Sequence, residues 1–217
     1  MRPIRTFGRV RSRTVKPAQA ALMETLLPHL AIPAGPFKPD GAFEEIWLEI
    51  GFGGGEHLAA QAAARRDVLM LGAEPFVNGV ASLLRHVDAQ QLDNVRVWPG
   101  DGRELTASLP DASLSRIFVL FPDPWPKARH RKRRLVDAAF AAEAARVLAP
   151  GGRLRFATDW ADYAHQALEV LSGSPDLTWA AERADGWRLA PTDHITTRYE
   201  TKRLGDCAPI WLEFRRL

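Results

Sequence analysis

Short apolar runs alternate with longer amphipathic stretches through most of this chain. Five of the runs are four to six residues long and are bounded by polar or turn-forming residues, as buried strands are. Alternation of such strands with helices predicts a parallel sheet that is covered by helices on both faces. Strands are expected at 46–50, 68–73, 95–98, 117–121 and 154–157, and an antiparallel pair is expected at 177–181 and 210–214.

The stretches between the runs predict helices, and the N-terminal part of the chain differs from the rest. Residues 32–41 are rich in Pro and Gly and predict a linker, whereas residues 1–16 predict a flexible basic arm. The chain of 217 residues fits one α/β domain, so we expect a single domain at 17–217 that begins with a helix. Helices are expected at 17–30, 57–64, 76–88, 135–148 and 161–171.

Acidic side chains stand at or just after the carboxyl ends of the predicted strands. Open parallel sheets bind their ligands beyond these ends, because the ends of parallel strands lie at one edge of the sheet. We therefore expect the acids to converge on one site. They are Glu49, Glu74, Asp101, Asp123 and Asp159.

The formal net charge is only +3, but the positive charge is concentrated in two segments. The first sixteen residues hold six Lys or Arg and no acid, and six of the eight residues at 127–134 are Lys or Arg. This distribution favours a nucleic-acid partner. The alternative is a basic tail, or a transit peptide, together with a solvated charged face.

Cysteine content and hydropathy exclude several classes of protein. Cys207 is the single cysteine, which excludes an internal disulfide and a cysteine cluster for metal and is compatible with a cytoplasmic location. No apolar stretch approaches the ~20 residues that a membrane helix needs. We therefore expect no membrane association and no bound metal.

A glycine-rich turn, Gly51 to Gly55, joins the first predicted strand to a helix. Glycine permits a tight turn and lets the backbone approach a ligand closely. Glu74 follows about 20 residues further on, where nucleoside-binding folds place the acid that binds ribose hydroxyls. A nucleoside site is thus predicted, with a purely structural turn as the alternative.

Charge distinguishes two possible nucleoside ligands. The dinucleotide fingerprint has a third glycine where this chain has Glu56, and a carboxylate there would repel a pyrophosphate at the helix N-terminus. S-adenosylmethionine carries a sulfonium cation and no phosphate, so an acidic site favours it. We predict S-adenosylmethionine as the ligand. For Asp101, a role as a turn residue is the alternative.

The segment from Phe121 to Lys127 is the most specific feature of the chain. Proline fixes its own φ and restricts the residue before it, so Pro122 and Pro124 are expected to hold Asp123 in a stiff turn at a strand end. Trp125 either stacks on a base or packs the turn. The cationic residues at 127–134, which we call the basic tract, follow directly. The combination therefore suits a polyanion with a planar base.

These motifs make the chain resemble the bacterial tRNA (guanine-N7)-methyltransferases, the TrmB family. The resemblance implies a class I, Rossmann-like fold of S-adenosylmethionine-dependent methyltransferases, with a mostly parallel seven-stranded sheet, helices on both faces and an antiparallel C-terminal strand. It implies methyl transfer from S-adenosyl-L-methionine to N7 of guanine at position 46 in the variable loop of tRNA, with S-adenosyl-L-homocysteine as the product. The matching segments stand at 48–57, 121–127, 130–135, 157–159 and 197–202.

The resemblance also implies roles for individual residues. Asp123 would be the catalytic residue. Gly102 departs from the family, where a small side chain such as Ala is expected, and this departure is expected to loosen the adenine pocket slightly. The cofactor would be bound by Glu49, Gly51, Gly53, Glu74, Asp101 and Asp123. The target nucleotide or the RNA would be bound by Lys127, Arg129, His130, Arg131, Lys132, Arg133, Arg134, Asp159, Thr197, Arg198, Tyr199 and Glu200.

Guanine N7 has an in-plane lone pair and no proton, so its methylation needs alignment and electrostatics rather than a general base. Asp123 is expected to orient the guanine and to stabilise the positive charge that develops on it. His57 is interpreted as a helix-start residue. His194 is interpreted as a loop residue with no obvious partner.

Other functions stay open on the sequence alone. A non-catalytic RNA-binding protein could use the same scaffold, although it has no need for an intact glycine turn and its acids. An amino-group methyltransferase of nucleic acids would carry Pro-Pro-aromatic after its acid or amide, whereas Pro126-Lys127 and the arginines follow here. A dehydrogenase is disfavoured by Glu56. No obligate protein partner is evident.

Overall fold

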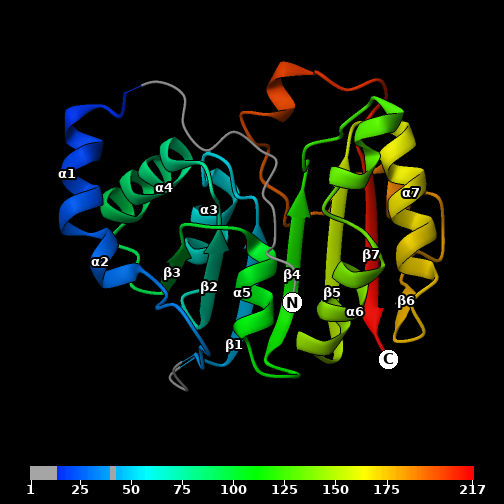
Figure 1. The fold of residues 1–217 in the computed structure, drawn as a ribbon, viewed down its shortest axis with the longest axis horizontal. Helices are drawn as coiled ribbons and strands as arrows, with labels where there is room; N and C mark the ends of the chain where they lie inside the picture. Colours follow the sequence, from blue (N-terminus) through cyan, green and yellow to red (C-terminus); the bar gives the residue numbers. More distant parts are fainter. Residues whose placement is uncertain (1–13, 40–42) are drawn as a thin grey trace. The chain divides into compact units, whose positions relative to one another are not determined.

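The computed structural model describes residues 14–39 and 43–217 (Figure 1). The described residues fall into two compact units that divide between Pro110 and Asp111. Each unit is described by itself. Most of the basic arm expected at 1–16 lies outside the described residues. The single domain expected at 17–217 stays a prediction.

Three parallel strands form the sheet of the first unit: β1 (Glu45–Ile50), β2 (Val68–Ala73) and β3 (Val95–Trp98), in the order β3-β2-β1. All six residues of β2 are buried, as a strand covered on both faces requires. The register places Ile50 opposite Ala73 and Ala73 opposite Trp98, so the three strands end together. The carboxyl ends of these strands therefore meet at one edge, as the sequence predicts.

The helices of the first unit are α1 (Pro17–Thr25), α2 (Leu27–Leu30), α3 (Glu56–Ala64), α4 (Val77–Gln90) and α5 (Gly102–Ser108). The single helix expected at 17–30 is broken at Leu26. Pro28 has no N–H to continue the helical ladder, which explains the break. The short α5 is not among the helices expected from the sequence.

The second unit contains β4 (Leu114–Leu120), β5 (Leu148–Thr158), β6 (Leu177–Trp179) and β7 (Ile210–Arg216), in the order β4-β5-β7-β6. β4 and β5 are parallel, whereas β7 is antiparallel to both β5 and β6. The expected antiparallel pair near the C-terminus is thus confirmed. β5 begins at Leu148, six residues before the strand expected at 154–157, and includes Pro150.

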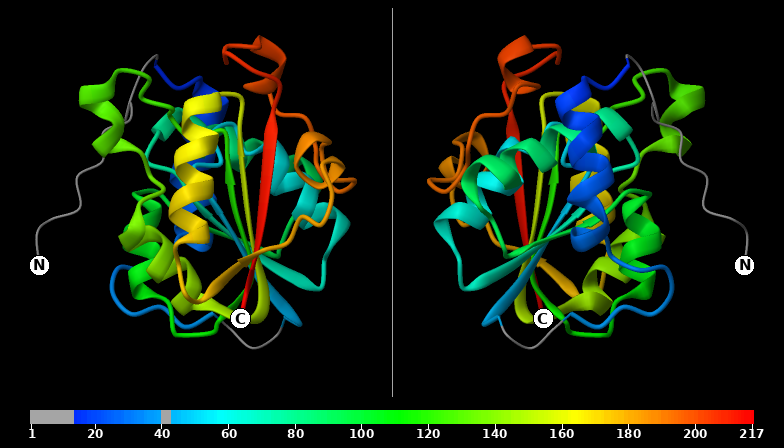
Figure 2. Two further views of the ribbon diagram at one scale, coloured as in Figure 1. Left: turned by 90° about the vertical axis from the view of Figure 1, so that its right-hand side faces the viewer. Right: turned by 90° about the vertical axis from the view of Figure 1, so that its left-hand side faces the viewer.

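The helices of the second unit are η1 (Ala128–Arg133), α6 (Ala138–Val147), α7 (Ala161–Ser172), α8 (Asp185–Arg188) and η2 (Glu200–Lys202). α6 begins three residues later than expected because the Asp137 side chain caps it, accepting from the Phe140 N–H at 2.8 Å. Figure 2 shows α7 on one face of β7 and the chain between β6 and β7 on the other face.

The fold class predicted from the sequence is confirmed, with seven strands that are mostly parallel and an antiparallel strand near the C-terminus. The largest fully buried side chain is Tyr163 of α7. No helix in the described ranges is both long enough and apolar enough to cross a membrane.

Candidate functional site

The glycine turn of the first unit follows β1 directly and leads into α3. Gly51, Gly53 and Gly55 have φ of +75°, +55° and +79°, a region that side chains rarely adopt. A Cβ built on Gly51 or Gly53 would meet no heavy atom within 4 Å. The backbone of the turn therefore faces open space at these two positions, as a nucleoside site of this kind requires.

Glu74 holds the glycine turn from the end of β2. Its Oε2 accepts a hydrogen bond from the Gly53 N–H at 2.9 Å, and its Oε1 accepts from the Phe76 N–H at 2.8 Å. The residue is 8% exposed. Because a carboxylate offers about four lone-pair sites, Glu74 can hold the turn and still accept bonds from ligand hydroxyls.

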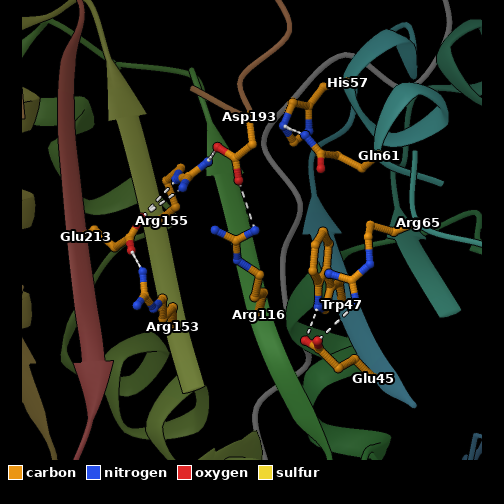
Figure 3. A network of polar contacts seen from close by, with 10 residues as sticks. All are labelled: Glu45, Trp47, His57, Gln61, Arg65, Arg116, Arg153, Arg155, Asp193 and Glu213. Atoms are coloured by element: carbon orange, nitrogen blue, oxygen red, sulfur yellow. Dashed lines mark hydrogen bonds and ion pairs between the residues drawn. The ribbon is translucent and has the colours of Figure 1, made fainter. Parts of the chain in front are cut away.

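Glu49, the penultimate residue of β1, is held by a buried histidine. His57 Nδ1 lies 2.8 Å from Glu49 Oε2, and Gln61 Nε2 lies 3.3 Å from His57 Nε2. All three side chains are buried; Figure 3 shows His57 and Gln61 together. The two ring nitrogens of His57 thus contact Glu49 on one side and Gln61 on the other. His57 thus positions Glu49, a role that the helix-start interpretation missed.

Asp101 lies just beyond β3 and is paired with an arginine. It caps α5 by accepting from the Arg103 N–H at 3.0 Å, and Arg103 Nη2 donates to Asp101 Oδ2 at 2.7 Å. This ion pair largely neutralises the negative charge of Asp101. The acidic character on which the sequence argument relied is thus weaker at this strand end than at the other two.

Gly102 is needed for packing against β1. A Cβ at Gly102 would lie 2.4 Å from Ile50 Cγ2, far inside van der Waals contact. The absence of a side chain therefore lets α5 approach β1, and the expected loosening of an adenine pocket finds no support here.

Glu56 stands in the first turn of α3, and its carboxylate folds back over the glycine turn. A Cβ built on Gly54 would lie 2.5 Å from Glu56 Oε2. The carboxylate therefore occupies the helix N-terminus, where a dinucleotide fold binds pyrophosphate. This placement supports the choice of a ligand without phosphate.

In the second unit, Asp123 follows β4 in a strained turn. Phe121 and Trp125 on either side of it have φ of +52° and +44°, unusual for bulky residues. Strain of this kind is typical of functional sites. In the part of the chain that the structure describes, no group donates a hydrogen bond to the Asp123 carboxylate or pairs with it. The side chain is exposed, yet desolvation by the surrounding protein raises the pKa of the carboxyl above its ordinary value.

Arg134 is a brace for this turn. Its side chain is 1% exposed, its Nε donates to the Pro124 carbonyl at 2.7 Å, and its Nη2 donates to Asp162 Oδ2 at 2.6 Å. The guanidinium also lies 4.7 Å from the centroid of the Tyr163 ring. We therefore revise the RNA-contacting role expected for Arg134, because its donors are used inside the protein.

The remaining cations of the basic tract lie on or beside η1. Arg133 Cζ lies 4.9 Å from the Trp125 ring centroid, and the His130 ring meets the Trp125 ring edge-on at 5.9 Å. Trp125 thus packs the turn in this structure. Desolvation, with the charges of Arg133 and other nearby cations, lowers the pKa of His130. The side chains that stay exposed are those of Lys127, Arg129, Arg131 and Lys132.

Asp159 follows β5, next to the strand that leads to Asp123. It is 5% exposed and accepts hydrogen bonds from the Tyr199 hydroxyl at 3.3 Å and from the Gly205 N–H at 3.0 Å. The Tyr199 ring also lies 5.6 Å from that of Phe121. The structure therefore brings Asp159 and Tyr199 together at the ends of β4 and β5.

Residues 193–200, which we call the target segment, are closed by an internal network. His194 Nε2 lies 3.0 Å from both carboxylate oxygens of Glu200, and the Thr197 N–H and Oγ1 donate to Glu200 Oε1 at 2.7 and 2.9 Å. The His194 ring packs against Trp211 at 4.4 Å. The interpretation of His194 as a residue without a partner is therefore wrong, and Glu200 organises the segment from within.

Within each unit the structure brings several of the expected site residues together. The first unit assembles the glycine turn with three acids, and the second assembles two acids with the target segment and the basic tract. Sequence reasoning missed the residues that hold these groups. Some lie close in the chain, as Arg103 does to Asp101, and others come from distant parts of it. They are His57, Gln61, Arg103, Asp162, Asp193 and Gly205. Within the described ranges, no group of three or more His, Cys, Asp or Glu could hold a metal ion.

The chain is similar to known methyltransferases over most of its length. Residues 44–211 match the profile of a family described as "Putative methyltransferase". A tRNA (guanine-N(7)-)-methyltransferase of Caulobacter sp. (strain K31) is 59% identical over 219 residues, which cover 99% of this chain and 96% of that protein. One of Hyphomonas neptunium is 49% identical over 217 residues, which cover 98% of this chain and 99% of that protein.

Solved structures show the same fold at low identity. A crystal structure of the 16S rRNA (adenine(1408)-N(1))-methyltransferase from Catenulisporales acidiphilia has a TM-score of 0.56 at 17% identity and covers 85% of this chain and 97% of that chain. A variant of that enzyme with its cosubstrate SAM has a TM-score of 0.58 at 16% identity and covers 85% and 96%. These likenesses support the class I fold assigned above.

Proposed function

The chain belongs to the family of tRNA (guanine-N7)-methyltransferases, and on this premise we propose that it transfers a methyl group from S-adenosylmethionine to N7 of the guanine at position 46 in the variable loop of tRNA. The observation that carries the proposal is the Asp123 turn. A constrained turn holds a carboxylate that accepts no hydrogen bond from a described residue, next to a basic tract, in a chain 59% identical to a tRNA methyltransferase over 99% of its length. The cytoplasmic location and the absence of an obligate protein partner stay predictions.

The donor site lies in the first unit. When bound, S-adenosylmethionine supplies a methyl group on a cationic sulfur, which a nucleophile displaces in line. The open space over Gly51 and Gly53 fits the approach of a nucleoside to the backbone, and Glu74 accepts from the ribose hydroxyls. We assign Glu49, which His57 holds in place, to the cationic end of the donor. We assign the adenine amine to Asp101, just beyond β3.

Asp123 orients the guanine. N7 of guanine needs no deprotonation, so the protein contributes alignment and charge stabilisation. Asp123 accepts from N1–H and the exocyclic amine of the base and stabilises the positive charge that develops on the ring. A carboxylate with an internal partner would first have to give up that partner. The rigid turn therefore prepares Asp123 for the base, and the brace by Arg134 keeps the turn in place.

The target nucleotide lies among Asp159, Lys127 and the target segment. Thr197, Arg198 and Tyr199 present polar groups from that segment, while Glu200 acts mainly through Thr197. The exposed cations of the basic tract bind tRNA phosphates, which gives salt-dependent binding with little dependence on RNA sequence. They are Lys127, Arg129, Arg131 and Lys132, with His130 and Arg133 at the edge of the surface.

The proposal is tested by mapping the product. Purified protein is incubated with S-adenosylmethionine and an unmodified tRNA transcript, and the RNA is then treated with borohydride and aniline, which cleave at N7-methylguanosine. We expect one cleavage at the variable-loop guanine, and none in a matched transcript with adenine there. Protein that never binds the donor in calorimetry would support a non-catalytic RNA-binding protein. An amino-methylated product would support the amino-group methyltransferase.

A further inference from the structure

One carboxylate of the target segment binds two arginines in the sheet of the second unit. Asp193 Oδ1 lies 2.6 Å from Arg155 Nη1 of β5, and Asp193 Oδ2 lies 2.9 Å from Arg116 Nη1 of β4. Figure 3 shows the Asp193 carboxylate between the two guanidinium groups. We call these three residues the Asp193 clamp. No motif in the sequence singles out any of them.

The clamp is embedded in a larger charged network on the same face of the sheet. Arg155 is 5% exposed, and its Nε and Nη2 donate to Glu213 Oε2 at 3.1 and 3.0 Å. Arg155 and Glu213 are direct partners in the β5–β7 register. The guanidinium groups of Arg116 and Arg155 lie 5.2 and 5.6 Å from the Phe118 ring centroid. Glu213 thus holds Arg155 in position for Asp193.

Arg155 is buried and Arg116 and Glu213 are mostly covered, whereas the Asp193 side chain is 36% exposed. Enclosing most of the charges of this network needs a reason other than stability. Charges lose hydration when they are buried, so apolar side chains of similar size would often stabilise the protein as well or better. The best-attested use of buried ion pairs is to select one geometry among several. Burial would raise the pKa of Asp193, but the hydrogen bond from Arg155 and the two positive charges lower it overall, which keeps the carboxylate ionised. The clamp therefore favours one position of the segment.

The clamp lies at one end of the target segment, and a second attachment lies near the other. His194, next to Asp193, bonds Glu200, which in turn accepts from Thr197. At the far end the Tyr199 hydroxyl donates to Asp159. With both ends attached, the residues between them are ordered before any RNA arrives. Binding of RNA therefore carries no further entropy cost for ordering them.

We propose that Asp193 is a positioning residue for the tRNA substrate: through Arg155 and Arg116 it fixes the target segment so that Thr197 and Tyr199 meet the target nucleotide. This inference rests on the proposed function for its substrate. Apart from Asp123, the residues expected to bind S-adenosylmethionine lie in the other unit. Loss of the clamp should therefore weaken the binding of tRNA and leave the affinity for S-adenosylmethionine unchanged.

The test compares Asp193→Asn with wild-type protein and with a matched control. The control is Asp176→Asn, which removes the exposed ion pair of Asp176 with Arg216, at 3.2 Å. For Asp193→Asn we expect the KM for tRNA to rise on the order of tenfold, with a smaller fall in kcat and an unchanged Kd for S-adenosylmethionine. Asp193→Glu keeps the charge and recovers part of the loss. Asp176→Asn behaves as wild type.

A second measurement reports the order of the segment directly. Arg198, Lys202 and Arg203 are exposed trypsin sites in or just after it. Trypsin is expected to cut there about tenfold faster in Asp193→Asn, as mapped by mass spectrometry, because local opening is more populated. Arg116→Gln removes one arm of the clamp and shifts both readouts in the same direction by less. If Asp193→Asn does not fold, the Arg116→Gln variant tests whether the clamp orders the target segment.

Two results would overturn the inference. One is a KM for tRNA and a trypsin pattern that match wild type. The other is a parallel loss of donor affinity and melting temperature, which marks a merely structural residue. If the wild-type protein does not methylate tRNA, the proposed function fails, and the trypsin comparison still decides whether the clamp orders the segment.

Discussion

The acids of the first unit and Asp123 of the second unit are held in opposite ways. Glu74 accepts from two backbone N–H groups, Asp101 is paired with Arg103, and Glu49 is held by His57. Asp123 has none of these supports in the part of the chain that the structure describes, and a strained backbone fixes its position instead. The acids that are expected to bind the methyl donor are thus held by hydrogen-bond partners of their carboxylates, from backbone and side chains. The acid that is expected to bind the guanine is held by the geometry of the backbone that carries it.

This difference follows from what each region binds. A donor that is mostly a neutral nucleoside needs acceptors at fixed positions, and bonds from the protein fix them without using every lone pair. The guanine base, which offers two hydrogen-bond donors, needs a carboxylate that is not already bonded to the protein. A partner on Asp123 would have to be displaced, at a cost of about 1–3 kcal/mol for each lost bond. Asp123 is therefore the residue whose loss is expected to matter most for the chemical step.

Replacement of Asp123 should break the acceptor side while sparing the donor side. For Asp123→Asn we expect single-turnover methyl transfer to tRNA to slow by on the order of a hundredfold or more, because the amide carries no charge to stabilise the cationic product. The Kd of S-adenosylmethionine should change far less than the rate, although Asp123 is among the residues expected to contact the donor. Asp111→Asn, a change in an exposed ion pair with Arg146, serves as the control. Near-normal turnover of Asp123→Asn would refute the role given to this residue.

Replacement of Glu74 should give the reverse pattern. Glu74→Gln loses charge-assisted bonds to the turn and to the ribose, each worth roughly 1.5–3 kcal/mol, so the Kd of the donor should rise about 10- to 100-fold in calorimetry. Glu104→Gln, at an exposed site in α5, is the matched control. An unchanged donor affinity would contradict the placement of the donor at the glycine turn.

Two arginines of the basic tract should separate stability from RNA binding. Arg134→Ala removes the brace of the Asp123 turn and should lower the free energy of unfolding by roughly 2 kcal/mol. Arg129→Ala should leave that free energy unchanged, weaken tRNA binding and reduce the salt slope of binding by about 1. Denaturant melts and salt titrations measure the two effects. If Arg134→Ala weakened RNA binding and left the free energy of unfolding unchanged, the bracing role given to Arg134 would be wrong.

As the pH falls, methyl transfer should be lost at a higher pH than the ionisation of an ordinary aspartate would give. The pKa of Asp123 is raised by desolvation, so its ionised form, and the activity that needs it, is present above that pKa and is lost as the pH falls through it. The acid limb of the rate profile should therefore lie above the ordinary range of Asp. Asp123→Asn should lack this limb; if it keeps the limb, another group is responsible.

Features with a local cause could be predicted from the sequence. Gly51 and Gly53 adopt positive φ because the chain turns sharply between strand and helix. Asp123 sits in a rigid turn because a proline stands on each side of it. The strand ends meet because parallel strands of similar length end together. Each of these inferences uses neighbours in the chain or the period of a strand, which a sequence displays directly.

Features that depend on tertiary pairing could not be predicted. Arg134 looks like one more cation of the tract, yet its partner Asp162 stands 28 residues away. Arg155 and Asp193 are 38 residues apart. Gly102 looks like a departure from the family, and only its close approach to Ile50, which would lie 2.4 Å from a Cβ at Gly102, reveals a packing role. No local rule distinguishes a buried arginine from an exposed one within a basic run.

The most direct test of the division between the two units is the dependence of the methyl-transfer rate on donor concentration, measured side by side for Glu74→Gln and Asp123→Asn. We predict that Glu74→Gln recovers most of its rate as S-adenosylmethionine is raised, because its defect is in donor affinity. Asp123→Asn should stay slow at every donor concentration. Recovery of Asp123→Asn at high donor, or failure of Glu74→Gln to recover, would contradict the account.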